Sequence, residues 1–195
     1  MARPGKKYEF KPDAPRRDIL SRLIPTQAQQ KVILKWALYS LLLLFLLLLQ
    51  DVVFSRFPIL GVTPDLVSAA ILLICICLGG ETGSVFALIA SSLYVFSGSA
   101  PHFYTLALLT VLGTVAAIFR QAYLQKGFGA AMLCGVASLM SYELLVFVIN
   151  LLLERTILSR MGIFCLTGLL SCVVLPILYP IVQSIGKIGG ETWKE

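Results

Sequence analysis

Carboxyl groups lie in and beside apolar stretches of this chain, where an ionised side chain is costly. Glu143 lies well inside SLMSYELLVFVINLLLE, while Asp65 and Glu81 flank LVSAAILLICICLGG. On a helix, Asn150 and Glu154 follow Glu143 by seven and eleven residues and share its face. This pattern indicates either a polar stripe that serves a ligand, a proton or a partner subunit, or a structural group that is protonated or hydrogen-bonded.

The residues around Asp65 have the composition of a helix start. Thr63 suits the N-cap, Pro64 the first helical position, and Asp65 the positive end of the helix dipole. Glu81 follows at the other end of the segment, about 24 Å away by helix rise, so the two carboxylates cannot share a substrate proton. We expect Asp65 at the outer rim of the protein, where a loop residue can contact a partner.

Small residues recur at every fourth position after this segment. Two helices can approach closely in a membrane where such residues line the contact. The spacing therefore predicts helix packing along one face of the next helix. The residues are Gly79, Gly83, Ala87 and Ser91.

Signatures of catalytic and metal sites are missing from the sequence. His102 is the sole histidine, which excludes a histidine-based metal site. The motifs G-x-S-x-G, H-E-x-x-H and G-x-x-x-x-G-K-[ST] are absent. Five cysteines lie within apolar runs and are interpreted as packing residues. We expect no enzyme, no cofactor, no metal and no catalytic residue, while binding or transport of a solute stays open.

The composition is that of an integral membrane protein. Of 195 residues, 58% are hydrophobic and 13% are charged, whereas soluble domains have about 25% charged residues. The apolar segments predict an all-α polytopic membrane protein with six transmembrane helices in one bundle. The expected spans are residues 33–54, 64–80, 82–97, 102–120, 128–153 and 161–185. The second and third are short, so a hairpin that does not fully cross the membrane is the alternative.

Basic residues are concentrated near the amino terminus, where the first 35 positions hold nine of the sixteen. With the amino terminus inside, thirteen basic residues lie on the inner side and three on the outer side, so we expect both termini in the cytoplasm. Residues 1–32 are expected to form a basic cytoplasmic tail, partly disordered or with an amphipathic helix at 16–24. This tail would rest on anionic lipid rather than bind nucleic acid. The six-helix domain would span 33–187, and 188–195 would form a short cytoplasmic tail.

Several motifs occur in a characteristic order after the basic tail. A leucine-rich helix ends in LLQDVVFSRFPILGVTPDLV, and GGETGSVFALIASSL follows. The fifth helix reads YELLVFVINLLL, and the sixth ends in LPILYPIVQSIGK. Over residues 33–187 this order resembles the bacterial rod shape-determining protein MreD family. One departure is ASSLYVFSGSAPHF, which lacks the aspartate that family members often have after the third helix.

The resemblance implies a non-enzymatic subunit of the cell-elongation machinery in the bacterial cytoplasmic membrane. It would bind an MreC-like protein and, through it, link MreB filaments to the peptidoglycan synthases RodA and penicillin-binding protein 2. The family's fold is similar to the S component of energy-coupling-factor transporters, so a vitamin-binding S component is the alternative. Those components dock through an alanine-x-x-x-alanine surface on the first helix. Ala37 is the only alanine in the predicted first helix of this chain. The leucine-rich stretch LLLLFLLLLQ of this helix therefore favours the scaffold subunit over the S component.

Overall fold

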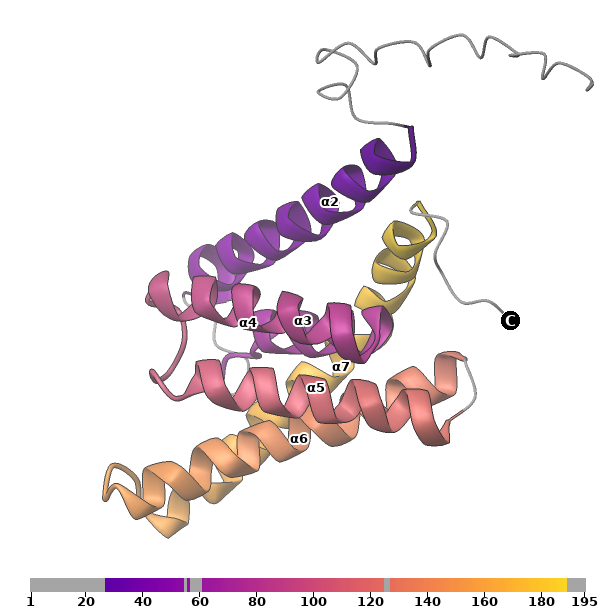
Figure 1. The fold of residues 1–195 in the computed structure, drawn as a ribbon. Coiled ribbons are helices and arrows are strands. Elements are labelled where there is room, and N and C mark those ends of the chain that lie inside the picture. Colours follow the sequence, from indigo (N-terminus) through magenta and orange to yellow (C-terminus); the bar gives the residue numbers. More distant parts are fainter. Residues whose placement is uncertain (1–26, 55, 57–60, 125–126, 189–195) are drawn as a thin grey trace, which may run out of the picture.

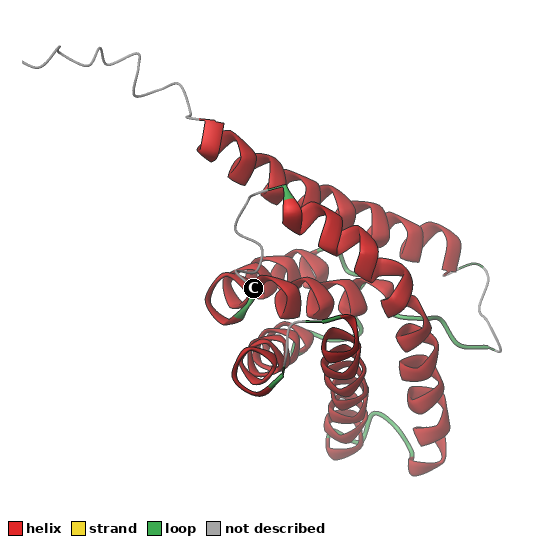
Figure 2. Cartoon of the chain, turned by 90° about the vertical axis from the view of Figure 1, so that its right-hand side faces the viewer, coloured by secondary structure: helices red, strands yellow, loops and turns green. Residues whose placement is uncertain are grey.

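The computed structural model describes residues 27–54, 56, 61–124 and 127–188. Helices joined by turns and loops make up this part of the chain, in agreement with the all-α prediction (Figure 2). The α-helices are α2 (Gln27–Leu49), α3 (Leu66–Leu78), α4 (Gly80–Phe96), α5 (Thr105–Tyr123), α6 (Phe128–Leu152) and α7 (Met161–Lys187). A π-helical turn, η1 (Gln50–Phe54), extends α2, and a 3-10 turn, η2 (Leu158–Arg160), precedes α7.

Four of the described helical segments are long and apolar enough to cross a membrane. They are Gln29–Phe54, Thr105–Tyr123, Phe128–Leu152 and Leu158–Lys187. The other two predicted spans form the shorter apolar helices α3 and α4. The structure is thus that of an all-helical protein whose long apolar helices are compatible with a multi-pass membrane protein.

The first helix begins earlier than the sequence predicted. Helix α2 starts at Gln27, so residues 27–32 are helical although they were expected to belong to the basic tail. The amphipathic helix predicted over residues 16–24 lies outside the described residues.

Successive helices alternate in direction through the bundle (Figure 1). The start of α2, the turn between α3 and α4, the end of α5 and the end of α7 lie toward the right of Figure 1. The end of α2 and the connections α4–α5 and α6–α7 lie toward the left. The two ends of the described chain therefore lie on the same side of the bundle.

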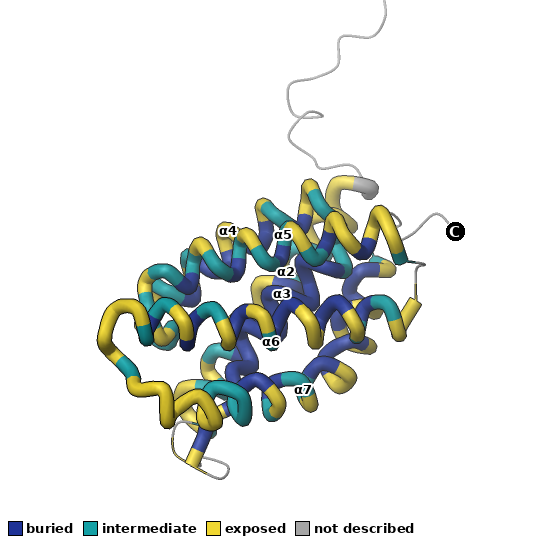
Figure 3. The backbone as a smooth tube through the Cα atoms, turned by 90° about the horizontal axis from the view of Figure 1, so that it is seen from below, coloured by how far each residue is buried: buried dark blue, intermediate teal, exposed yellow. Residues whose placement is uncertain are grey.

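Helix α3 occupies the centre of the bundle, in contact with α2, α4, α5, α6 and α7. Residues 66–76 are all buried, and the tube of α3 is dark blue along almost its whole length in Figure 3. Its sequence is apolar on every face, and a helix of this kind is stable only where protein or lipid covers it on all sides. The outer helices instead expose large apolar side chains such as Leu41 and Val115, a surface that suits lipid.

A single residue, Gly79, links α3 to α4. Its φ of 92° lies in the left-handed region, which glycine adopts without steric cost. Its N–H donates to the carbonyl oxygen of Cys75 at 3.1 Å and so closes the end of α3. Gly79, the first member of the predicted series of small packing residues, thus lies in the turn between the two helices.

The other small residues of the predicted series lie on the inner face of α4. A Cβ at Gly83 would overlap the carbonyl oxygen of Cys75 on α3, so the two backbones are in direct contact there. Ala87 is fully buried, and the Ser91 hydroxyl lies 3.2 Å from that of Thr110 on α5. The spacing of small residues therefore marks the face of α4 that packs against α3 and α5.

Candidate functional site

A buried carboxylate organises the amino-terminal end of α3. Asp65 is the N-cap residue, and its Oδ1 accepts a hydrogen bond from the backbone N–H of Ser68 at 3.0 Å. The Tyr94 hydroxyl at the end of α4 donates to the same oxygen at 3.0 Å. The sequence prediction placed the N-cap at Thr63, two residues too early, because Thr-Pro-Asp also fits a helix that starts at the proline.

Long-range hydrogen bonds tie this end of α3 to two further helices. The backbone N–H of Asp65 donates to Ser171 Oγ on α7 at 2.8 Å. Gln50, in η1, accepts from the Val67 N–H at 3.1 Å and donates to the Tyr94 hydroxyl at 3.1 Å. Asp65 is only 7% exposed, so the structure places it inside the bundle and not at an open rim where it was expected. Four residues far apart in the sequence thus form one polar network around a helix end.

The opposite end of α3 has a buried cation, Arg120, the last residue of the predicted span 102–120. Arg120, in the last turn of α5, is 4% exposed, and its Nη1 donates to the carbonyl oxygen of Ile76 at 3.1 Å. The last carbonyls of a helix lack intrahelical donors and form the negative end of its dipole. The short central helix therefore has an acidic group at its amino end and a basic group at its carboxyl end.

Replacing Arg120 by lysine is expected to lower the free energy of unfolding by about 1 kcal/mol. Lysine keeps the charge but lacks the planar guanidinium that reaches Ile76. Thermal unfolding of the purified protein in detergent measures the effect. Arg160→Lys, at an exposed position in η2, is the matched control and should leave the midpoint unchanged. Equal midpoints for the two variants would show that the guanidinium contact adds nothing to stability.

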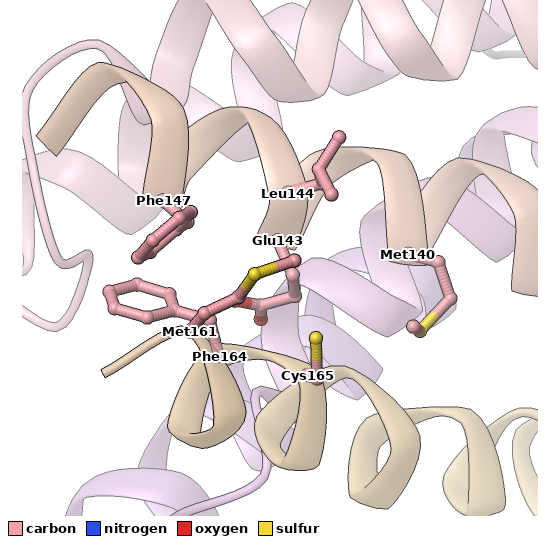
Figure 4. A pocket seen from close by; sticks show the side chains of 7 residues that line it. All are labelled: Met140, Glu143, Leu144, Phe147, Met161, Phe164 and Cys165. Atoms are coloured by element: carbon pink, nitrogen blue, oxygen red, sulfur yellow. The ribbon is translucent and has the colours of Figure 1, made fainter. Parts of the chain in front are cut away.

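Glu143 lies at the contact between α6 and α7. It is 6% exposed, and its side chain points from α6 toward α7, close to Met161 and Cys165 (Figure 4). A Cβ at Gly168 would lie 3.3 Å from Glu143 Cγ, so the glycine lets α7 approach α6 here. Within the described part of the chain, no hydrogen bond joins the Glu143 carboxyl group to another residue.

A small pocket adjoins the Glu143 side chain. Its volume is about 30 Å³, which is room for about two water molecules. Apart from Glu143, its lining is apolar and comes from α6 and α7: Met140, Leu144, Phe147, Met161, Phe164 and Cys165. The rings of Phe147 and Phe164 are tilted by 58° with their centroids 5.4 Å apart, and they bound one end of the pocket (Figure 4).

Further buried polar atoms lie near these groups without a hydrogen bond of standard geometry among the described residues, although Tyr142 lies beside Thr105 and Asn150 beside Tyr104. They include the hydroxyls of Tyr142 and Thr105 and Oδ1 of Asn150. Tyr142 lies within electrostatic reach of both Asp65 and Glu143. Buried polar atoms of this kind ordinarily bind ordered water or a ligand group.

The polar stripe predicted on α6 is shorter than expected. Glu143 and Asn150 are both buried in this helix, 6% and 3% exposed. Glu154, predicted as the third member, lies beyond the end of α6 in a turn, where it is exposed with a φ of 56°. Tyr142, the residue before Glu143 on the helix, points to a different side of α6. It is also buried, because α6 packs against α3, α5 and α7.

His102 lies in the connection between α4 and α5, where it stacks on Tyr104 with ring centroids 5.0 Å apart. Burial and, to a lesser degree, the nearby Arg155 guanidinium lower the pKa of His102 below its usual value. The imidazole is therefore neutral at pH 7. The described residues contain no group of three or more histidine, cysteine, aspartate or glutamate side chains placed to hold a metal ion.

No family model, curated protein or solved structure matches the chain. The functional argument therefore rests on the composition, the helix arrangement and the buried polar groups. Of the residues predicted to have a role, Asp65 and Glu143 lie within electrostatic reach of each other although no hydrogen bond joins them. Gln50, Ser171 and Arg120 were missed, since each is an ordinary polar residue until the fold brings it to an end of α3.

Proposed function

We propose that this protein is a non-enzymatic scaffold subunit of the bacterial cell-elongation complex, of the MreD type. It would bind an MreC-like membrane protein and, through it, connect MreB with RodA and penicillin-binding protein 2. The motif order from LLQDVVF to LPILYPIVQSIGK motivates the assignment. The protein would lie in the cytoplasmic membrane with both ends of the chain inside.

The observation that carries the proposal is the filled centre of the bundle. Helix α3 fills the centre of the bundle, and its residues 66–76 are all buried by the surrounding helices. The pocket beside Glu143 has a volume of about 30 Å³, whereas pockets for small molecules begin at about 300 Å³. A packed interior with an apolar exterior supports a protein that acts through its surface.

The distribution of charge supports the proposed orientation. Lys31, Lys35 and Lys187 lie near the start of α2 and the end of α7, on the side where the described chain begins and ends (Figure 1). Over the whole sequence, that side would hold thirteen of the sixteen basic residues. Basic residues are retained on the cytoplasmic side, which favours cytoplasmic termini.

We also propose that all six helices traverse the membrane region, as in the S components of energy-coupling-factor transporters. Helix α4 has 17 residues, a length of about 25 Å. It exposes Val85, Ile89 and Phe96 on its outer face, and this supports contact with lipid. Helix α3 has 13 residues, about 20 Å, and would span only in the shelter of its neighbours.

Recovery of partners from membranes tests the scaffold role. A tagged copy, solubilised in mild detergent from cells of the source organism, should retain an MreC-like protein and an elongation synthase. A tagged polytopic protein of unrelated function is the control for unspecific recovery. Equal recovery of these proteins with the control would contradict the proposal.

A vitamin-binding S component is the second candidate, and one observation favours it. The polar atoms of Tyr142, Thr105 and Asn150, which make no hydrogen bond of standard geometry, lie in the interior of the described bundle, where they could contact a small polar solute. Native mass spectrometry would detect a retained vitamin, and a panel of vitamins would then raise the unfolding midpoint. A protein without bound solute whose midpoint is unmoved by the panel would exclude this candidate.

A further inference from the structure

Three of the seven side chains that line the pocket between α6 and α7 contain sulfur. Figure 4 shows the sulfur atoms of Met161 and Cys165 beside the Glu143 carboxyl group. Met140 is the third, and its Sδ lies 2.9 Å from the position of a Cβ on Gly168. Glu143 Cγ lies 3.3 Å from the same position, so Met140 and Glu143 are near neighbours. Three sulfur donors and one oxygen donor therefore surround a small void.

The spacing of these donors along the chain brings them to the contact between the two helices. Met161 and Cys165 are four residues apart on α7, and Met140 and Glu143 are three apart on α6. Each pair therefore shares one face of its helix. The two faces meet at the pocket, where α6 packs against α7. Paired ligands on facing helices are the way in which helical bundles hold metal ions.

Glu143 gives an independent indication that the pocket has a ligand. It is 6% exposed, and no hydrogen bond joins its carboxyl group to another described residue. A buried carboxyl group ordinarily has a hydrogen-bond partner or coordinates a metal ion. The thioethers of Met140 and Met161 have no hydrogen to donate, and the rest of the lining apart from Cys165 is hydrocarbon. A cation bound by the sulfur atoms would give the carboxyl oxygen its partner.

The chemistry of the donors selects the kind of ion. Thioether and thiol sulfur are soft ligands that favour Cu(I), whereas Ca²⁺ and Mg²⁺ require oxygen and Zn²⁺ is bound by cysteine, histidine and carboxylates. The pocket volume of about 30 Å³ suits one ion, and it is far below that of a small-molecule site. Cu(I) that binds the Cys165 thiolate displaces the thiol proton. One monovalent cation replaces another, so the charge buried in the bundle does not change.

We infer that Met161, Cys165 and Glu143, together with Met140, form a binding site for one Cu(I) ion between α6 and α7. The Cu–S bond forms at Cys165 as its proton leaves, and the thioethers and the carboxyl oxygen complete the coordination. Met161 is 43% exposed at the start of α7, which makes it the point of entry for the ion. The bound ion would fasten α7 to α6.

No metal was expected from the sequence, because the chain has a single histidine. The methionine donors come together only through the contact between α6 and α7. The site is independent of the scaffold role, because it requires the described chain alone and no second protein.

Titration of the purified full chain with Cu(I) tests the inference. The protein is kept in detergent without oxygen, and a chromogenic Cu(I) chelator serves as the competitor that measures the affinity. Native mass spectrometry should count one ion per chain. Free Cu(I) at about a hundredfold excess over its Kd should raise the unfolding midpoint by about 5–10 °C. X-ray absorption at the copper edge should show at least two sulfur ligands.

Variants with matched controls connect the binding to the pocket. Loss of a group that merely orients a metal ligand already costs about 10- to 100-fold in affinity, so Cys165→Ala and Met161→Leu should each cost at least about tenfold. Cys134→Ala and Met132→Leu remove the same donor types from other positions on α6 and should keep the original affinity. Glu143→Gln retains an oxygen donor and should cost less than Cys165→Ala. Unfolding midpoints without copper verify that every variant is folded.

Four results would overturn the inference. They are absence of bound Cu(I), an unchanged affinity in the double variant Met161→Leu/Cys165→Ala, a midpoint that Zn(II) raises as far as Cu(I) does, and a copper spectrum without a second sulfur ligand. The second of these would place copper at the other cysteines, and the third would show that soft donors do not select the ion. Recovery of an MreC-like protein depends on none of them, so the two proposals fail separately.

Discussion

Replacement of Gly83 by alanine is expected to lower the free energy of unfolding by about 2–3 kcal/mol. The new methyl group would overlap the Cys75 carbonyl oxygen, a backbone atom that cannot rotate away, so α3 and α4 must separate. For a protein of this size the unfolding midpoint should fall by about 5–10 °C. A thiol-reactive dye that labels the buried cysteines on heating measures the midpoint in detergent.

Two other glycines provide matched comparisons for Gly83. A Cβ at Gly113 would meet the side chain of Cys75, with Sγ at 3.1 Å, so Gly113→Ala should be rescued in part by Cys75→Ala. The same rescue should fail for Gly83→Ala, because the backbone oxygen remains. Gly129, near the start of α6, has open space around it, and Gly129→Ala should leave stability unchanged or raise it by up to about 1 kcal/mol. Full rescue of Gly83→Ala by Cys75→Ala would contradict the backbone contact.

Replacement of Asp65 by alanine is expected to lower the free energy of unfolding by about 2–4 kcal/mol. The change removes the N-cap of α3 and leaves the Tyr94 hydroxyl without its acceptor in a buried site. Thermal unfolding in detergent and amide hydrogen exchange in the first turn of α3 both report the loss. The exchange rate at Ser68 should rise more than the rates near the carboxyl end of α3, because the Ser68 N–H donates to the lost carboxylate.

The conservative variant Asp65→Asn distinguishes the stabilising effect of the N-cap hydrogen bonds from that of the negative charge. The amide side chain would keep an acceptor oxygen for Ser68 and Tyr94, so this variant should retain most of the stability. Glu81→Ala is the control for an acidic residue in the first turn of a helix, since Glu81 is exposed. An effect of Asp65→Ala no larger than that of Glu81→Ala would show that the network around Asp65 does not stabilise α3.

The helical architecture could be predicted because it depends on local composition. Apolar runs of sufficient length and glycine at the end of α3 are visible in the sequence, and all six helices were expected near their observed positions. The spacing of Gly83, Ala87 and Ser91 also indicated the packed face of α4. Helix ends were less accurate, as with the N-cap of α3, because neighbouring residues fit the same cap equally well.

The polar network could not be predicted because its members come from distant parts of the chain. The Asp65 N–H finds its acceptor 106 positions away in Ser171, and Arg120 reaches a carbonyl 44 positions away. Nothing in the local sequence distinguishes Ser171 from the other serines. Arg120, at the end of a predicted span, gave no sign of burial, since arginine near a helix end normally points toward water or lipid head groups.

The enclosure of α3 has a consequence for the order in which the protein is made. Helix α3 has 13 residues, a length of about 20 Å, which is too short to span alone a bilayer about 30 Å thick. Because Gly79 joins α3 directly to α4, the two would enter the membrane together as a hairpin in the proposed six-helix topology. The acceptor for the Asp65 N–H is then synthesised 106 residues later, on the order of 5–20 s at ordinary rates of translation. Helix α7 thus completes the bundle. Until α7 has been synthesised, α3 lacks part of the helix contacts that bury it.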